Sequence, residues 1–167
     1  MNEKMQIKDV CTALDAWAPL AFQESYDNVG LLVGDESMRV NGVLVTLDVT
    51  DEVITEAKEK GCNLIVAHHP VLFKGLKKIT GKGLVERMVI RAIKEDIAIY
   101  ASHTNLDSVS HGVSVEMARR LSLQNIRVLQ PQKNRLQKWE IFVPFSYKEV
   151  VLSALFEAGA GQIGAYD

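Results

Sequence analysis

Two hydrophobic patterns alternate along the first 130 residues and predict strands and helices. Short runs of consecutive apolar residues are typical of strands that are buried on both faces. These runs lie at residues 31–34, 42–48, 63–67, 97–101 and 126–129. Apolar residues spaced by three and four positions predict amphipathic helices at residues 7–17, 52–60, 83–95 and 112–121. Parallel strands need helix-length crossover connections, so this order predicts an α/β fold in which the last four strands form a mainly parallel sheet flanked by helices.

The composition of the chain changes near residue 130. Residues 130–135 are polar and include a proline, which is typical of a linker. Beyond them, residues 139–143 alternate like a strand and residues 147–158 predict a helix closed by a glycine. We therefore expect an α/β domain at residues 1–130. Residues 131–167 would then hold a linker and a strand–helix pair that is too small to be an independent domain.

A pair of histidines follows the strand at residues 63–67. His68 and His69 are adjacent, and Pro70 ends the strand because proline cannot donate to a sheet ladder. Open α/β sheets bind ligands outside the carboxyl ends of their strands. Where the backbone bends at such an end, adjacent imidazoles can converge instead of pointing to opposite faces. The pair therefore fits a metal site, and it also fits histidines that cap a helix or are satisfied by backbone groups.

A second polar cluster follows the strand at residues 97–101 and contains His103 and Asp107. If the two strands are parallel neighbours, their carboxyl ends lie about 5 Å apart. Three imidazoles and a carboxylate would then surround one crevice, and such ligands suit zinc, iron, manganese or nickel. Taken singly, His103 and Asp107 also fit ordinary loop polarity. Together with the histidine pair, they favour a metal site.

Two other acidic residues leave alternatives open. Asp48 lies at the carboxyl end of the strand at residues 42–48, where it fits either a contact to the metal ligands or a capping or turn residue. Asp27 and Asn28 precede a short strand and fit the role of turn formers.

The composition and charge exclude several functional classes. A net charge of −2 with mixed signs gives no basic footprint for a nucleic-acid partner. Cys11 and Cys62 are isolated, which argues against a disulfide framework and favours a reducing compartment. The sequence shows no signal peptide and no run of about 18 apolar residues that could span a membrane. We therefore expect a cytoplasmic protein with no membrane or nucleic-acid partner.

A lysine-rich loop follows the histidine pair. Loops after strand ends often line binding sites. These lysines fit a solvated loop face, and they also fit an attraction for a phosphate-bearing substrate near the metal. They are Lys74, Lys77, Lys78 and Lys82.

Four segments of the chain resemble the Nif-three-like family, whose members are also labelled homologues of a type-2 GTP cyclohydrolase I. The segments are Ser25–Gly34 (SYDNVGLLVG), Ala67–Pro70 with Phe73 following, Ser102–Asp107 (SHTNLD) and Gly159–Gly164 (GAGQIG). Their order and spacing agree with the family along the whole chain. The resemblance implies a two-metal centre to which this chain contributes His68, His69 and Asp107. We expect His103 at the edge of that centre, in contact with the ligands or the substrate.

The resemblance also implies a longer chain and an oligomer. Family members form ring-shaped hexamers and hold two divalent ions per full-length chain. Their remaining ligands, a histidine and a glutamate one helical turn apart, lie near the C-terminus, beyond an inserted α+β domain that residues 131–167 would begin. No histidine follows His111 in this sequence. We therefore expect a C-terminally incomplete chain that holds at most one weakly bound ion and has negligible hydrolase activity.

The expected function is a metal-dependent hydrolase that acts on a nucleotide or another phosphorylated small molecule. Two metal ions can lower the pKa of bound water to about 7 and stabilise both the attacking and the leaving oxygen. No Ser-His-Asp order, nucleophile elbow or P-loop motif indicates another chemistry. The alternative is a non-catalytic metal-binding scaffold or regulator that acts through protein partners, an association that the family name records.

Overall fold

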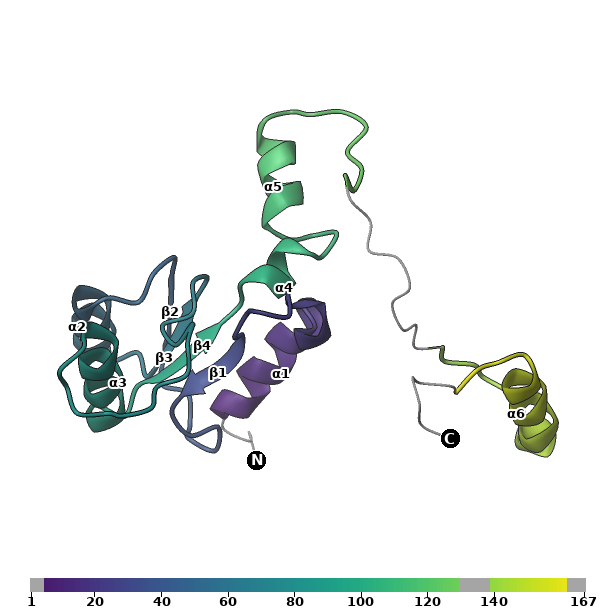
Figure 1. Ribbon diagram of the computed structural model, residues 1–167, viewed down its shortest axis with the longest axis horizontal. Helices are drawn as coiled ribbons and strands as arrows, with labels where there is room; N and C mark the ends of the chain where they lie inside the picture. The colour runs from purple at the N-terminus through teal and green to yellow at the C-terminus, as the bar shows by residue number, and fades with distance from the viewer. Residues whose placement is uncertain (1–4, 130–138, 162–167) are drawn as a thin grey trace. The chain divides into compact units, whose positions relative to one another are not determined.

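A computed structural model gives the structure of residues 5–129 and 139–161. The chain divides into two compact units, Met1–Ile126 and Arg127–Asp167 (Figure 1). The first unit holds α1 (Ile7–Trp17), the 3-10 helix η1 (Leu20–Phe22), β1 (Gly30–Val33), β2 (Val43–Thr46), α2 (Asp51–Glu59), β3 (Leu64–Ala67), α3 (Leu84–Lys94), β4 (Ala98–Ala101), α4 (Thr104–Asp107) and α5 (Val113–Arg120). The second unit holds the 3-10 helix η2 (Phe145–Tyr147) and α6 (Lys148–Glu157). Within these described residues, every helix is too short or too polar to cross a membrane.

The strands of the first unit form one sheet in the order β1-β4-β3-β2. β2, β3 and β4 are parallel, with α2 and α3 in the connections between them, and β1 pairs with β4 in the antiparallel sense. Thr46 lies opposite Ala67 and Ala67 lies opposite Ala101, so the three parallel strands end at the same edge of the sheet. The mainly parallel sheet flanked by helices is therefore confirmed.

Different helices cover the two faces of this sheet (Figure 1). α2 and α3 bury Ile54 and Val89 against Ile65 of β3. On the other face, α1 buries Ile7 against Tyr100 of β4. All four residues of β4 are buried. Burial on both faces explains why the central strands are continuous apolar runs without alternation.

Local side-chain signals fix the ends of the helices. The Thr50 hydroxyl accepts a hydrogen bond of 3.2 Å from the backbone N–H of Val53 and caps α2. Gly61 ends the turn after α2 with a φ of +68°, a conformation that favours glycine. At the start of α1, the Asp9 carboxylate accepts a hydrogen bond of 2.7 Å from the backbone N–H of Gln6. The four helices predicted between residues 7 and 121 are confirmed to within about two residues, which is the usual uncertainty of helix ends.

Two of the predicted strands are wrong. Residues 126–129 and 139–143 form no strand, and the side chain of Leu129 is 99% exposed. An apolar run becomes a strand only when its backbone pairs with another strand and its side chains are buried. Over the described residues, all strands of the sheet lie between Gly30 and Ala101. The predicted helix at residues 147–158 is confirmed as α6, whereas the predicted linker at residues 130–135 lies outside the described residues.

Glu95 joins α2 to α3 and makes the stability of the first unit depend on pH. Its Oε1 accepts hydrogen bonds of 3.3 Å from Lys58 Nζ and 3.3 Å from Arg91 Nε. Burial raises the pKa of Glu95, but the hydrogen bonds from Arg91 and Lys58 outweigh it and hold the pKa below the ordinary 4.5. The ionised carboxylate therefore stabilises the fold above the unfolded pKa, and this contribution is lost as the pH falls through the lower folded pKa.

We expect Glu95→Gln to lower the free energy of unfolding by about 1 kcal/mol at neutral pH, a typical value for such pairs. The difference from the wild type should shrink as the pH falls below about 4.5, because the wild-type carboxylate then becomes protonated. Urea denaturation across this pH range measures both effects, with the exposed Glu59→Gln as the control. A difference that does not change with pH would contradict the assignment to Glu95 ionisation.

Candidate metal centre

The carboxyl ends of β3 and β4 bring three histidines together. His68 and His69 follow β3 directly, and His103 lies two residues after β4. The backbone N–H groups of His68 and His69 donate to the carbonyls of Thr46, the last residue of β2, and Leu47 over 3.1 and 2.9 Å. The histidine pair therefore extends the pairing of β3 with β2. The parallel sheet therefore places the three imidazoles at one edge, as the sequence predicted for neighbouring strands.

The three imidazole rings form one cluster. Their ring centroids are separated by 5.0 Å for His68 and His69, 5.2 Å for His68 and His103, and 5.5 Å for His69 and His103. One candidate ligand atom from each residue lies within 4.8 Å of the other two. Ligand atoms this close to one another could all bind the same metal ion.

Each ring uses its Nδ1 in a hydrogen bond to an oxygen atom. His68 Nδ1 donates to the carbonyl of Ser102 over 2.9 Å, His69 Nδ1 to Asp48 Oδ1 over 2.7 Å, and His103 Nδ1 to Asp27 Oδ1 over 2.9 Å. Carbonyl and carboxylate oxygens only accept, so the proton of each neutral ring lies on Nδ1. The Nε2 lone pairs are then available for a metal, in the arrangement that commonly orients histidine ligands.

Among these oxygen partners, Asp27 is held by burial and by several hydrogen bonds. Its side chain has no exposed surface. Besides His103, it accepts hydrogen bonds from the Thr104 hydroxyl, from the Thr104 backbone N–H over 3.0 Å and from the Asn28 backbone N–H over 2.8 Å. Burial raises the pKa of Asp27, but the hydrogen bonds from Thr104 and His103 outweigh it and keep the pKa below 3.8. Asp27 therefore presents a fixed negative charge to His103 at neutral pH.

The sequence alone did not find this role of Asp27. In the sequence, Asp27 fits a turn former that precedes Asn28, and it lies 76 residues from His103. The available signal was its position inside the first segment that resembles the family. The sequence allows Asp48 either a contact to the ligands or a cap or turn, and its hydrogen bond to His69 favours the first alternative.

A buried asparagine positions the backbone of His103. Asn105 is fully buried, and its Oδ1 accepts a hydrogen bond of 2.9 Å from the backbone N–H of His103. Its Nδ2 donates to the carbonyl of Ala18 over 2.7 Å, which ties the loop to the end of α1. His103 is therefore held at both its backbone and its ring.

Asp107, a predicted ligand, and His111, which the sequence does not predict as a ligand, both lie outside the cluster. Asp107 is the last residue of α4 and donates its backbone N–H to the carbonyl of His103 over 3.1 Å. It is not a member of the histidine cluster, so its role as a metal ligand stays a prediction. His111 stacks on Trp17 at 6.1 Å and donates from Nε2 to the Trp17 carbonyl over 2.9 Å, as a local surface contact.

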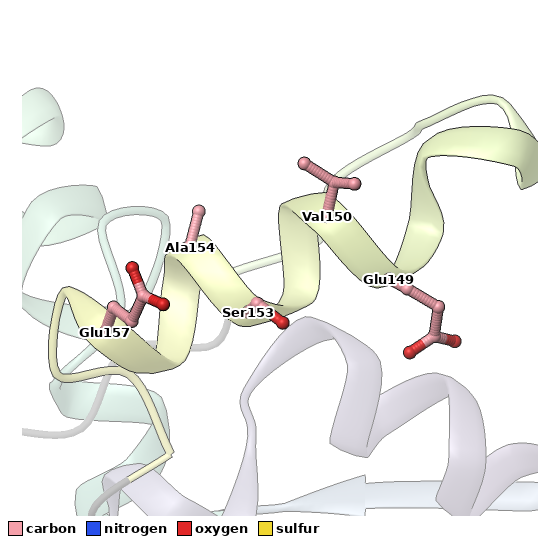
Figure 2. A pocket seen from close by; sticks show the side chains of 5 residues that line it. All are labelled: Glu149, Val150, Ser153, Ala154 and Glu157. Carbon is pink, nitrogen blue, oxygen red and sulfur yellow. The ribbon is translucent and has the colours of Figure 1, made fainter.

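A hollow also lies along α6 in the second unit. Figure 2 shows that all of its labelled side chains project from this one helix: Glu149, Val150, Ser153, Ala154 and Glu157. Among the described residues, the cluster of metal-compatible side chains is the one at His68, His69 and His103. The hollow therefore adds no candidate for the metal chemistry.

Comparisons with known proteins agree on one family. A sequence model of the family described as Duf34/NIF3 (NGG1p interacting factor 3) matches residues 5–167. A GTP cyclohydrolase 1 type 2 homolog of Staphylococcus aureus (strain MRSA252) is 42% identical over 98% of this chain and 44% of its own length. A protein of the same name from Bacillus subtilis (strain 168) is 39% identical over 99% of this chain and 45% of its own length.

A solved structure has the same fold. The crystal structure of a Bacillus cereus protein related to NIF3 superposes with a TM-score of 0.74 at 35% identity, over 99% of this chain and 46% of that protein. This chain therefore spans less than half the length of the curated relatives that it matches.

Proposed function

We propose that this chain, which belongs to the Duf34/NIF3 family, binds a divalent metal and contributes to a hydrolase for a nucleotide or another phosphorylated small molecule. The observation that carries the proposal is the convergence of three imidazoles whose Nδ1 atoms all donate to oxygen atoms. Histidines that are satisfied in a core or at a helix cap have no need to bring three rings together in this way.

The donor set fits a transition metal. His68, His69 and His103 would hold the ion through Nε2, and neutral imidazoles suit zinc, iron or nickel. Asp107, as expected from the family, would add a carboxylate that also suits manganese. A bound ion would supply a Lewis acid that polarises a phosphoryl or carbonyl oxygen and lowers the pKa of a coordinated water.

The other side chains of the centre would prepare the histidines and attract the substrate. Asp27 and Asp48 would accept hydrogen bonds from the Nδ1 atoms of His103 and His69, which orients each neutral ring with its Nε2 lone pair available to a metal. The Lys74, Lys77 and Lys78 side chains in the exposed loop after β3 would attract a phosphate by their charge.

Metal titration and a substrate screen test the proposal. The chain would be titrated with Zn²⁺, Mn²⁺ or Fe²⁺ and then assayed on nucleotides and general phosphoesters. Turnover that requires the added metal and disappears in a folded His69→Ala variant would support the hydrolase. This chain alone is expected to have negligible activity, so a full-length relative is assayed beside it. Metal binding without turnover in both proteins would support the alternative, a metal-binding scaffold that acts through protein partners. The expected homohexamer is measured separately by light scattering.

The two aspartate partners should differ in their effect on metal affinity. We expect Asp27→Asn to weaken zinc binding by about 10- to 100-fold, the usual range for partners of metal-ligating histidines. Asp48→Asn should have a smaller effect, because the Asp48 side chain is 60% exposed whereas that of Asp27 is fully buried. Competition with a chromophoric chelator measures both variants. Equal losses would show that burial of the partner does not control how firmly the ring is held.

A further inference from the structure

Two exposed aromatic side chains border the histidine cluster. The rings of Tyr26 and Phe73 are 6.4 Å apart with an interplanar angle of 56°, and Phe73 meets the ring of His103 edge-on at 6.4 Å. The side chain of Tyr26 is 64% exposed and that of Phe73 is 44% exposed. Neither ring belongs to the hydrophobic core of the sheet, so packing of the fold does not explain their position.

The two loops that carry these rings are held together. Asn28 Nδ2 donates to the carbonyl of Leu72 over 2.5 Å, which joins the segment after Tyr26 to the segment before Phe73. Asp27 in turn bonds to His103. This hydrogen bond and the bond of Asp27 to His103 hold the two segments that carry Tyr26 and Phe73 beside the cluster.

We propose that Tyr26 and Phe73 form an aromatic wall that binds the planar heteroaromatic ring of the ligand while the histidine cluster engages its reacting part. This inference rests on the proposed function, because the ligand is the molecule on which the metal centre acts. Aromatic rings pair in stacked or edge-to-face arrangements at centroid distances of about 4.5–7 Å, so an exposed pair of rings offers a flat ring a contact.

The charges beside the wall fit a ligand with an anionic group. Lys74 follows Phe73 directly, and Lys77 and Lys78 continue the exposed loop. A molecule that joins a flat ring to phosphate groups would contact the wall with its ring and the lysines with its charge. The ring contact would select the heterocyclic part of the ligand, whereas the lysines and the metal would act on any phosphate.

Saturation-transfer NMR with GTP, together with a calorimetric titration of tripolyphosphate, separates these contributions. In the presence of EDTA, the wild-type chain should transfer saturation to the guanine H8 proton. Tyr26→Ala and Phe73→Ala should each weaken GTP binding by at least about fivefold, the lower end of the effect of removing a stacking partner. Both variants should leave tripolyphosphate affinity unchanged, and Tyr26→Phe should retain GTP binding because it retains the ring.

Phe22→Ala is the matched control, since Phe22 is 51% exposed and is not among the described ring contacts of the histidine cluster. Absence of H8 saturation in the wild type would overturn the inference, and so would equal GTP affinity in the wild type and the alanine variants. Because these measurements are made without metal, they are independent of the zinc titration. Failure of that titration would overturn the proposed function, whereas the aromatic wall would still be decided by GTP binding in the presence of EDTA.

Discussion

Replacing His103 by alanine is expected to lower the affinity of this chain for zinc by more than about 100-fold. Loss of a residue that only supports a ligand already costs up to about 100-fold, and the loss of a direct ligand removes a metal bond as well. The expectation rests on the convergence of the His103 ring with those of His68 and His69. Titration calorimetry, or competition with a chelator where binding is weak, measures the change.

Two further variants make this experiment decisive. His111→Ala is the control, because His111 bonds to Trp17 and is not a member of the cluster. Asp107→Ala tests the ligand that the family resemblance predicts, and a loss as large as that of His103→Ala would add this carboxylate to the ligand set. A loss of only about 10- to 100-fold in His103→Ala would limit His103 to a contact with the ligands at the edge of the centre, a role that the family resemblance predicts. Unchanged zinc affinity would remove it from the metal site.

Replacing Gly34 by alanine is expected to destabilise the first unit by about 3 kcal/mol. Gly34 follows β1 with a φ of +107°, where an L-residue is strained by about 1–2 kcal/mol. An added Cβ would lie 2.6 Å from the Cβ and 2.7 Å from the Cα of Ala98 in β4. The backbone must shift to relieve this overlap, and such overpacking typically costs about 1–3 kcal/mol.

Thermal unfolding measures this effect. A loss of about 3 kcal/mol corresponds to about 6–12 °C in Tm for a chain of this size. Gly75→Ala is the matched control, because no atom lies within 4 Å of the Cβ that it would add and its φ is not in the left-handed region. A Tm for Gly34→Ala equal to that of the control would show that β1 can move away from β4 without loss of stability.

Strand β1 connects the Gly34 experiment to the His103 experiment. Gly34 allows β1 to approach β4, and the segment before β1 carries Asp27 to His103. A shift of β1 should therefore also disturb the buried aspartate. The antiparallel edge strand thus links the stability of the sheet to the orientation of one candidate ligand.

The sequence determined most of the secondary structure of the first unit. The strands at residues 42–48, 63–67 and 97–101 and the helices between them follow from hydrophobic periodicity, which depends on residues close in the chain. The position of His68, His69 and His103 at one sheet edge also follows, because successive parallel strands joined by helices end on the same side. The same reasoning failed at residues 126–129, where the apolar run predicts a strand but does not pair with the sheet.

Only the tertiary structure decided which polar groups meet. The hydrogen bonds of His103 to Asp27 and of His69 to Asp48 span 76 and 21 residues, and no local pattern encodes such pairs. The antiparallel pairing of β1 with β4 likewise depends on which sheet edge is free once the parallel strands have assembled. Periodicity specifies which side of an element is buried, because burial depends on the composition of a whole face. A hydrogen-bond partner depends on register and loop path to within an ångström, and these are set only when all the elements have packed.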